Sequence, residues 1–383
     1  MQRIRHAILL ATGVSLALAG CASDPNRLEG PNYGRKSSAF VSSTLSTLTP
    51  DPALPDAGPS LVRRVVLIGD AGNMTHNEET LSTLGRWGDA HAERSRVVFL
   101  GDNLYPAGLR EDDRERGERV LRSQLDATQA SKTFTPGNHD WGYPVPSAEN
   151  LGREERFIEA RPDANFRPRD GCPGPSVETL SAPGGDVPRG LSVVFIDLQW
   201  WLLPADQRPE CGGVDEERAA RELADRLEAL KGQWVIVAAH HPLRSGGPHG
   251  GLSYGWAADR VVSVLGWWLG SMQNTYEPAY ANATEQIRAA LAPTRPLLYA
   301  AGHDHNLQLL EGDASTQYEV VSGAGSVRRV STVTEIPGTL FAHAYPGFVV
   351  LDFHSTPSGE EVRLHVVETG RDAPVMSTRL AGS

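Results

Sequence analysis

The chain has 383 residues, of which 40% are hydrophobic and 22% charged, and its formal net charge is −11. This negative charge argues against the basic surface of nucleic-acid-binding proteins, so we expect no nucleic-acid partner. About 320 residues follow the N-terminal region, which suits one domain with a large hydrophobic core.

The first twenty residues have the pattern of an export signal. A basic start, MQRIRH, precedes the apolar run AILLATGVSLALAG, which is short for a membrane span. LAGC at 18–21 matches a bacterial lipoprotein signal, so residues 1–20 are predicted to be a lipoprotein signal peptide and Cys21 the lipidated residue that anchors the chain to the membrane. The alternative is an ordinary secretory signal. Because Ala22 is not the Asp that resembles an inner-membrane retention signal, we expect the outer membrane, with the folded part in the periplasm or at the cell surface.

Residues 21–60 are rich in Ser, Thr, Pro, Gly and Asp and show little periodicity, which predicts a flexible tether. A single folded domain would then occupy residues 61–383, and we expect it to be a monomer.

Within that domain, helical patterns alternate with short apolar runs that are typical of strands. The helices are predicted at 77–93, 111–130, 215–231 and 281–292. Late strands are predicted at 347–353 and 361–367, and they suggest a second sheet packed on the first. The expected fold class is therefore α/β.

Five short polar blocks each follow one of the apolar runs. They are GDAG at 69–72, GDNLY at 101–105, GNHD at 137–140, AHHP at 239–242 and GHDH at 302–305. Each block would therefore present its polar side chains at the C-terminal end of a strand, where open α/β sheets build their active sites.

Together the blocks contain the ligands of a two-metal site. Two ions roughly 3.5–4 Å apart need one bridging ligand and oxygen or nitrogen donors on both flanks. We assign the bridge to Asp102, in the central block, because a carboxylate can face both ions. The two histidines of GHDH are two residues apart, so on an extended segment both rings would point to one face and Asp304 to the other. The proposed donors are Asp70, Asp102, Asn138, His240, His303 and His305.

With these blocks the chain resembles the metallophosphoesterases, or calcineurin-like phosphoesterases, and within them the purple acid phosphatases. Gly72 stands where most of the superfamily has a histidine, and Tyr105 lies three residues after Asp102. GHDHNLQ at 302–308 and SGAG at 322–325 resemble the small, single-domain type. The resemblance covers about residues 61–354 and implies a metallophosphoesterase β-sandwich of two mixed sheets flanked by helices, with the catalytic domain at 61–383.

The resemblance also implies a division of the ligands between two sites. Asp70, Asp102, Tyr105 and His305 would bind Fe(III), for which a phenolate is a suitable hard donor. The divalent ion would be Fe, Zn or Mn. Its ligands would be Asp102, Asn138, His240 and His303. For Tyr105 the alternative is a core tyrosine beside the second strand.

Such a centre is suited to hydrolysis of phosphomonoesters by attack of a metal-bound hydroxide on a small phosphorylated substrate. His139 and His249 are assigned to substrate contact and proton delivery. His241 stands where the small type usually has an aromatic residue, and its role stays open between the site and a buried structural position. A phosphodiesterase or nucleotidase of the same superfamily and a non-catalytic surface lipoprotein are the alternative functions.

Two further features have both a functional and a structural interpretation. Cys172 and Cys211 could form a disulfide outside the cytoplasm, worth roughly 4 kcal/mol in the chain-entropy model, or remain two buried thiols. Aromatic residues could line the pocket or belong to the core or to the inner face of a lid. They lie in QWWLL at 199–203 and at Tyr254, Trp256, Trp267, Trp268 and Tyr276.

Overall fold

The computed structural model describes residues 39–49, 57–73, 77–142, 145–250, 273–275, 277–326 and 330–382. The predicted signal peptide, Cys21 and the aromatic residues Tyr254, Trp256, Trp267, Trp268 and Tyr276 lie outside these residues. Within the described part of the chain, no helix is long and apolar enough to cross a bilayer.

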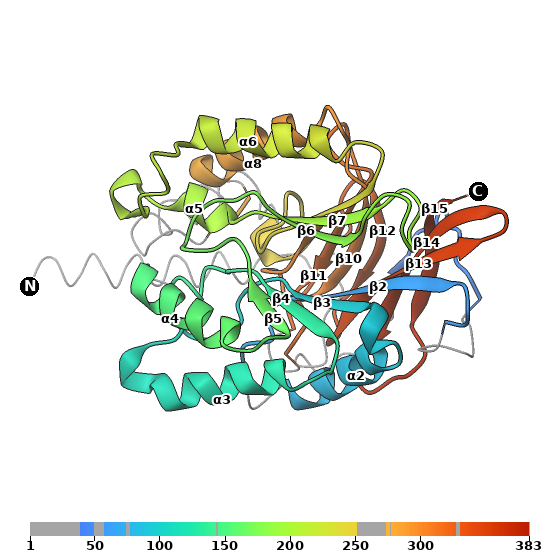
Figure 1. Ribbon diagram of the computed structural model, residues 1–383, viewed down its shortest axis with the longest axis horizontal. Coiled ribbons are helices and arrows are strands. Elements are labelled where there is room, and N and C mark those ends of the chain that lie inside the picture. Colours follow the sequence, from blue (N-terminus) through green and yellow to red (C-terminus); the bar gives the residue numbers. More distant parts are fainter. Residues whose placement is uncertain are drawn as a thin grey trace, which may run out of the picture.

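The described strands form two mixed sheets that pack face to face (Figure 1). The seven-stranded sheet has the order β15, β14, β13, β2, β3, β4, β5, with bounds Met376–Gly382, Gly359–Glu368, Gly347–Thr356, Leu61–Ile68, Ser95–Phe99, Ser131–Phe134 and Ala164–Phe166. The eight-stranded sheet has the order β1, β12, β10, β11, β9, β8, β7, β6, with bounds Phe40–Val41, Thr339–His343, Leu307–Glu311, Tyr318–Ser322, Leu298–Ala301, Trp234–Ala238, Leu191–Phe195 and Ser176–Ser181.

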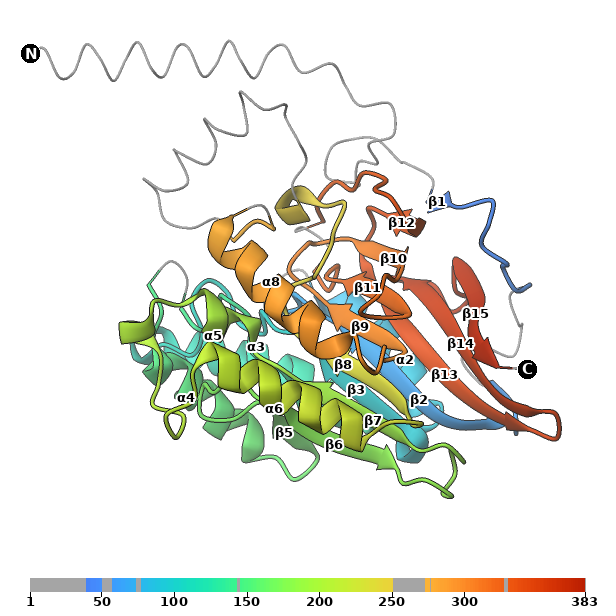
Figure 2. The ribbon, with the colours of Figure 1, turned by 90° about the horizontal axis from the view of Figure 1, so that it is seen from above.

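Helices cover the outer face of each sheet (Figures 1 and 2). The seven-stranded sheet is covered by α2 (Glu78–Asp89), α3 (Arg114–Leu125) and α4 (Ala148–Glu159). The eight-stranded sheet is covered by α5 (Leu198–Leu202), α6 (Glu216–Ala229) and α8 (Pro278–Leu291). Short 3₁₀ helices lie at Ala92–Arg94, Glu111–Asp113, Ala205–Gln207 and Pro248–Gly250. The predicted α/β sandwich of two mixed sheets flanked by helices is therefore confirmed.

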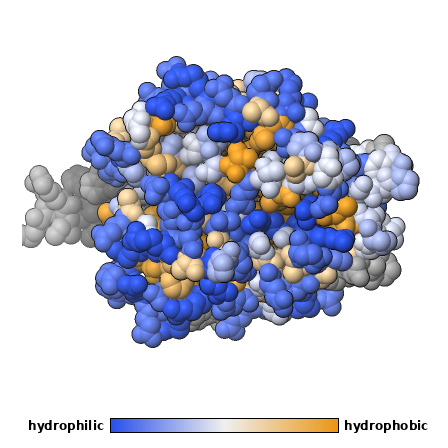
Figure 3. All heavy atoms as spheres, in the orientation of Figure 1, coloured by the Kyte–Doolittle hydropathy of each residue, from blue (hydrophilic) through white to orange (hydrophobic). Residues whose placement is uncertain are grey.

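Strand β2 shows how the sequence separates the layers. Its side chains alternate between the two faces of the sheet. Val66 and Ile68 join the core under α2 and α3, whereas Val65 and Leu67 join the core between the sheets. Both faces of this central strand are thus buried, which explains its nearly continuous apolar run. The surface is mainly hydrophilic on the face shown in Figure 3, and Val41 and Val145 are the exposed large hydrophobic residues among those described.

The predicted helices are confirmed as α2, α3, α6 and α8, and a side-chain cap marks the start of one of them. In α6 the side chain of Asp215 accepts a hydrogen bond from the main-chain N–H of Arg218 and so begins the helix at Glu216.

The position predicted for the late strands was wrong. β13 and β14 do not belong to a second sheet, because β13 pairs with β2 and extends the sheet that carries the first three polar blocks. The second sheet is built around β7, β8 and β9 instead. Apolar alternation identifies a strand, but it does not identify the partner of that strand.

Part of the segment predicted to be a flexible tether lies against the folded domain. Phe40 and Val41 pair with β12 at the edge of one sheet, and Thr47 bridges Thr378 of β15 at the edge of the other. Leu45 packs against the core between the sheets. Residues 39–49 therefore connect the edges of both sheets, and the folded unit includes residues N-terminal to position 61.

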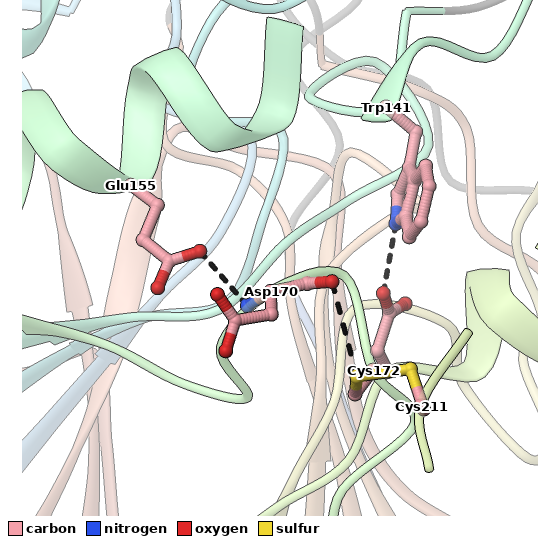
Figure 4. Close-up of a disulfide and its surroundings, with 6 residues drawn as sticks. Trp141, Glu155, Asp170, Cys172 and Cys211 are labelled. Atoms are coloured by element: carbon pink, nitrogen blue, oxygen red, sulfur yellow. Dashed lines mark hydrogen bonds between the residues drawn. A yellow bond between two sulfur atoms is a disulfide. The ribbon is translucent and has the colours of Figure 1, made fainter. Parts of the chain in front are cut away.

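Cys172 and Cys211 form a disulfide with their Cα atoms 5.7 Å apart (Figure 4). The bond fixes the loop that contains Gly171, where an added Cβ would lie 2.8 Å from the ring of Trp141. Trp141 follows the GNHD block directly, and its indole N–H donates to Asp197 at 2.7 Å. The disulfide loop thus packs against Trp141, the residue that follows the GNHD block.

A buried ion pair joins β2 to β13. Arg64 and Asp352 are both fully buried, and the guanidinium donates to the two carboxylate oxygens at 2.7 Å each. The guanidinium also donates to the main-chain carbonyl of Trp87 and stacks on its ring. Burial alone would raise the pKa of Asp352, but the contact with Arg64 holds it below its usual value.

We expect Asp352→Ala to lower the free energy of unfolding by about 3–5 kcal/mol, because it leaves the Arg64 guanidinium buried without a counter-charge. The double variant Arg64→Met/Asp352→Leu removes both charges and should be much closer to the unsubstituted protein. Urea denaturation of the three proteins measures the difference. A single variant no less stable than the double variant would contradict this account.

Candidate metal centre

The five polar blocks meet at one end of the sandwich. Asp70, Asp102 and Asn138 follow β2, β3 and β4 of one sheet, whereas His240 and His303 follow β8 and β9 of the other. A main-chain hydrogen bond joins the two sheets here, from Gly69 N–H to the Ser322 carbonyl at 2.7 Å, and another joins two blocks of the same sheet, from Gly302 N–H to the His240 carbonyl at 2.9 Å. The sequence prediction that strand ends assemble the site therefore agrees with the structure.

Three of the predicted ligands have an unusual backbone conformation. Asp70, Asp102 and His303 have φ values of 60°, 52° and 69°, in the left-handed region that non-glycine residues rarely adopt. Such conformations cluster at functional sites, where the surrounding structure enforces them. The turn at each residue directs its side chain toward the space between the two sheets.

The extended conformation predicted for GHDH was wrong, because His303 has a positive φ and residues 303–306 form a bend. Both rings nevertheless reach the site. His305 contacts Asp70, and His303 contacts His240.

One group of donor atoms consists of a carboxylate, a phenol and an imidazole. The hydroxyl of Tyr105 lies 2.9 Å from Oδ1 of Asp70 and 3.3 Å from Nε2 of His305. The same nitrogen lies 3.2 Å from Oδ1 of Asp70. Ligands at right angles around a metal ion with bonds of about 2.1 Å are about 3 Å apart. This triangle therefore fits three cis ligands of one ion.

Gly72 allows Tyr105 to reach this position. A Cβ at residue 72 would lie 2.5 Å from backbone atoms of Asn103 and Leu104 and 2.6 Å from the carbonyl oxygen of Asp102. The two segments are also hydrogen-bonded, because Gly72 N–H donates to the Asp102 carbonyl and Tyr105 N–H donates to the Gly72 carbonyl. A histidine at position 72 could not fit beside this loop. The paired exchange of glycine and tyrosine thus has a steric basis.

A second group of atoms that could bind a metal ion comes from Asn138, His240 and His303, and these atoms face one another. Nδ1 of His240 lies 2.8 Å from the Leu100 carbonyl, and Nε2 of His303 lies 3.2 Å from the Gln273 carbonyl. A carbonyl can only accept, so these nitrogens donate, and the opposite nitrogen of each ring is the one whose lone pair can bind a metal ion.

Those two nitrogens, Nε2 of His240 and Nδ1 of His303, are 3.2 Å apart. Oδ1 of Asn138, another acceptor, lies 3.0 Å from Nε2 of His240. These three atoms would be suitable ligands of one cation, and the hydrogen bonds on the far side of the histidines are typical of metal sites.

Asp102 lies between the two groups. Its Oδ1 is 3.5 Å from Nε2 of His240 and accepts from the main-chain N–H of His139 at 2.9 Å. Donor atoms of Asp70, Asp102 and His240 all lie within 4.8 Å of one another. Asp102 is thus placed to be the shared ligand of two ions.

The charge states of the donors suit metal binding. Burial alone would raise the pKa of Asp102, but the adjacent His240 and His139 outweigh it and lower that pKa to about 2. Burial, together with the neighbouring histidines, lowers the pKa of His303 well below its usual value. The site thus offers a charged carboxylate and a neutral imidazole.

Buried polar residues that the sequence analysis did not assign hold the two loops together. Asp140 accepts from the main-chain N–H groups of Gly137 and Leu104 at 2.8 and 2.9 Å, so it ties the Asn138 loop to the Tyr105 loop. Asn103 donates to the same carboxylate at 3.0 Å and also to Glu154 on α4. Burial raises the pKa of Glu154 to about 8. Two members of this network, Asn103 and Asp140, lie inside the GDNLY and GNHD blocks, which was the sequence signal for it.

The two predicted catalytic histidines lie on either side of the donor atoms. Nδ1 of His139 donates to the Pro106 carbonyl at 2.6 Å, and its Nε2 lies 4.0 Å from Oδ2 of Asp102. The ring of His249 packs on His303 with a centroid distance of 4.1 Å. Its main-chain N–H donates at 3.0 Å to Asp304, a fully buried residue. Both histidines are half-buried beside the proposed metal ligands.

His241 is fully buried, and its Nε2 donates to Oε1 of Gln273 at 3.0 Å. Burial lowers the pKa of His241 to about 3, so the ring is neutral. Trp200 and Trp201 of the QWWLL segment are buried in the core formed with α6 and α8, which agrees with their structural interpretation.

Comparisons with known proteins agree with this geometry. The family model for calcineurin-like phosphoesterases matches residues 63–307. Human tartrate-resistant acid phosphatase type 5 is 24% identical over 241 residues, which are 60% of this chain and 61% of the human protein. The chain thus spans less than two thirds of that relative.

Among solved structures, GAP50 of Plasmodium is similar with a TM-score of 0.55 at 17% identity, over 84% of this chain and 89% of that protein. The purple acid phosphatase PPD1 of yellow lupin, Lupinus luteus, has a TM-score of 0.53 at 15% identity, over 84% and 54% of the two chains. At these identities the structures support the fold. The family match covers more than half of the chain, which therefore belongs to the calcineurin-like phosphoesterase family and is similar to the purple acid phosphatases.

Proposed function

We propose that this protein is a dinuclear-metal phosphatase that hydrolyses phosphomonoesters, with Fe(III) in one site and Fe, Zn or Mn in the other. The observation that carries the proposal is the convergence of Tyr105, Asp70 and His305 within 3.3 Å of one another beside Asp102. A phenolate and carboxylates are hard anionic donors suited to Fe(III), whereas Asn138, His240 and His303 offer donors suited to a divalent ion.

Two bound cations would neutralise charge on a phosphoryl group and activate water, and a ferric ion would do so at a lower pH than a divalent ion. The chain supplies the remaining parts. Asp102 holds both sides of the centre in a fixed relation. His139, oriented by the Pro106 carbonyl, and His249, oriented by Asn274, are placed to contact the phosphate ester and deliver a proton to the leaving oxygen.

The proposal is tested first on iron-replete protein purified without its signal peptide. We expect a visible absorption band from charge transfer between the Tyr105 phenolate and Fe(III). We also expect hydrolysis of 4-nitrophenyl phosphate at acidic to neutral pH, faster than hydrolysis of bis(4-nitrophenyl) phosphate. Tyr105→Phe should remove the band and keep the divalent ion. Colourless protein containing both metals, or a band that survives in the variant, would rule out the tyrosine ligand. A preference for the diester would favour a phosphodiesterase.

The proton-delivery roles predict a separation between metal binding and turnover. His139→Ala and His249→Ala should retain both metals and lose about 10²–10⁴-fold in kcat, with the larger loss on an alkyl phosphate that needs leaving-group protonation. Asp102→Ala and His303→Ala, as matched controls, should lose metal first. Elemental analysis beside kinetics on both esters makes the comparison, and equal losses on the two esters would refute proton delivery.

We further propose that the protein is a lipoprotein anchored through Cys21, on the evidence of LAGC at 18–21. A protein of the same fold, Plasmodium GAP50, is named as the anchor in the inner membrane complex. We expect Cys21→Ser to abolish incorporation of a labelled fatty acid and to release the protein from the membrane fraction of a bacterial host. Labelling that persists in the variant would contradict the anchor.

A further inference from the structure

Two adjacent residues outside the five blocks, Gln273 and Asn274, contact three histidines of the site. Both are more than nine-tenths buried, with exposed fractions of 6% and 3%. Gln273 has a φ of 53°, so it shares the unusual left-handed conformation of the proposed ligands.

Gln273 holds two histidines and is itself held. Its main-chain carbonyl accepts from Nε2 of His303 at 3.2 Å, and its side-chain Oε1 accepts from Nε2 of His241 at 3.0 Å. Its amide NH₂ donates to Oε1 of Gln199, a residue of α5, at 2.7 Å. This last bond fixes which end of the amide faces His241. The left-handed backbone sets the direction of the carbonyl toward His303.

Asn274 holds the third histidine. Its Oδ1 lies 3.1 Å from Nδ1 of His249, and because an amide oxygen only accepts, Nδ1 carries the proton. The main chain of the following residue, Thr275, donates to the His249 carbonyl at 2.8 Å. The His249 loop is therefore fixed from both its backbone and its ring.

We propose that Gln273 and Asn274 are positioning residues that select the reactive nitrogen of each histidine: Nδ1 of His303 for the divalent ion and Nε2 of His249 for the substrate. This inference rests on the proposed metal centre. Residues that accept a proton from the far nitrogen of a ligating histidine fix its tautomer and orientation, and their loss costs about 10–100-fold in metal affinity or activity. Because Gln273 and Asn274 are adjacent in the chain, one segment holds both the metal ligand His303 and the proton donor His249.

The contact between the Gln273 carbonyl and His303 can be tested by changing the backbone conformation of residue 273. Gln273→Val places a β-branched residue where φ is positive, which should turn the carbonyl away from His303. Gln273→Gly accepts the same φ and should keep the carbonyl in place. Arg295→Val is a matched control, because Arg295 also has a positive φ, of 44°, but lies after α8 in contact with Thr316.

We expect Gln273→Val to weaken the affinity of the iron-containing protein for Zn²⁺ by about 10–100-fold, with the Tyr105 absorption band retained. Arg295→Val should bind Zn²⁺ like the unsubstituted protein, and Gln273→Gly, which lacks the side chain but accepts the same φ, should bind Zn²⁺ more tightly than Gln273→Val. Selective loss of the divalent ion distinguishes positioning from general damage to the fold. Unchanged affinity in Gln273→Val, or equal losses in the Val and Gly variants, would overturn the role of the carbonyl while leaving the phosphatase proposal standing. Unsubstituted protein whose second site takes up none of Fe²⁺, Zn²⁺ and Mn²⁺ would overturn both.

The contact between Asn274 and His249 is tested by substitutions at Asn274. Asn274→Leu should keep both metals and lose about 10–100-fold in kcat on an alkyl phosphate, with a smaller loss on 4-nitrophenyl phosphate. Asn274→Asp, which restores an acceptor for Nδ1 of His249, should recover most of the activity. Loss of a metal in Asn274→Leu, equal losses on both esters, or no recovery in Asn274→Asp would overturn the assignment.

Discussion

The candidate metal centre brings together donor atoms that repel one another in the absence of a cation. Oδ1 of Asn138 and Nδ1 of His303 lie 3.0 and 3.2 Å from Nε2 of His240. The carboxylates of Asp70 and Asp102 lie in the same buried region, where Asp70 accepts from the Tyr105 hydroxyl at 2.9 Å. Such an arrangement is costly for an empty site and favourable around cations. The strained backbone at Asp70, Asp102 and His303 and the close approach at Gly72 serve this convergence.

The rest of the sandwich holds the donors in place against that repulsion. Each sheet supplies part of the site, so the two sheets must keep their relative positions. The core between the sheets and the segment 39–49 across their edges connect them. Behind individual donors, Leu100 and Gln273 fix the histidine tautomers, and Asp140 ties two loops together. Farther out, the disulfide loop packs on Trp141, which follows Asp140 in the chain.

The sequence predicted the fold class and the strand ends that meet at the candidate site, but not every strand pairing around it. Asp70, Asp102 and Asn138 could be placed because a strand ends where its apolar run ends, and parallel strands bring those ends together. The pairing of β13 with β2 could not be predicted from periodicity, although Arg64 and Asp352, charged residues in otherwise apolar strands, were a signal for it. Gln273 acts through a carbonyl that every residue has, so its role depends on a backbone direction that only the structure shows.

The central claim is that two ions share Asp102, with iron on the side of Tyr105. A crystal structure with anomalous diffraction measured on both sides of the iron absorption edge tests it directly. The account predicts two peaks roughly 3.5–4 Å apart, one on each side of Asp102, with the iron-specific signal beside Tyr105, Asp70 and His305. A single ion, or iron bound only beside Asn138, His240 and His303, would contradict it.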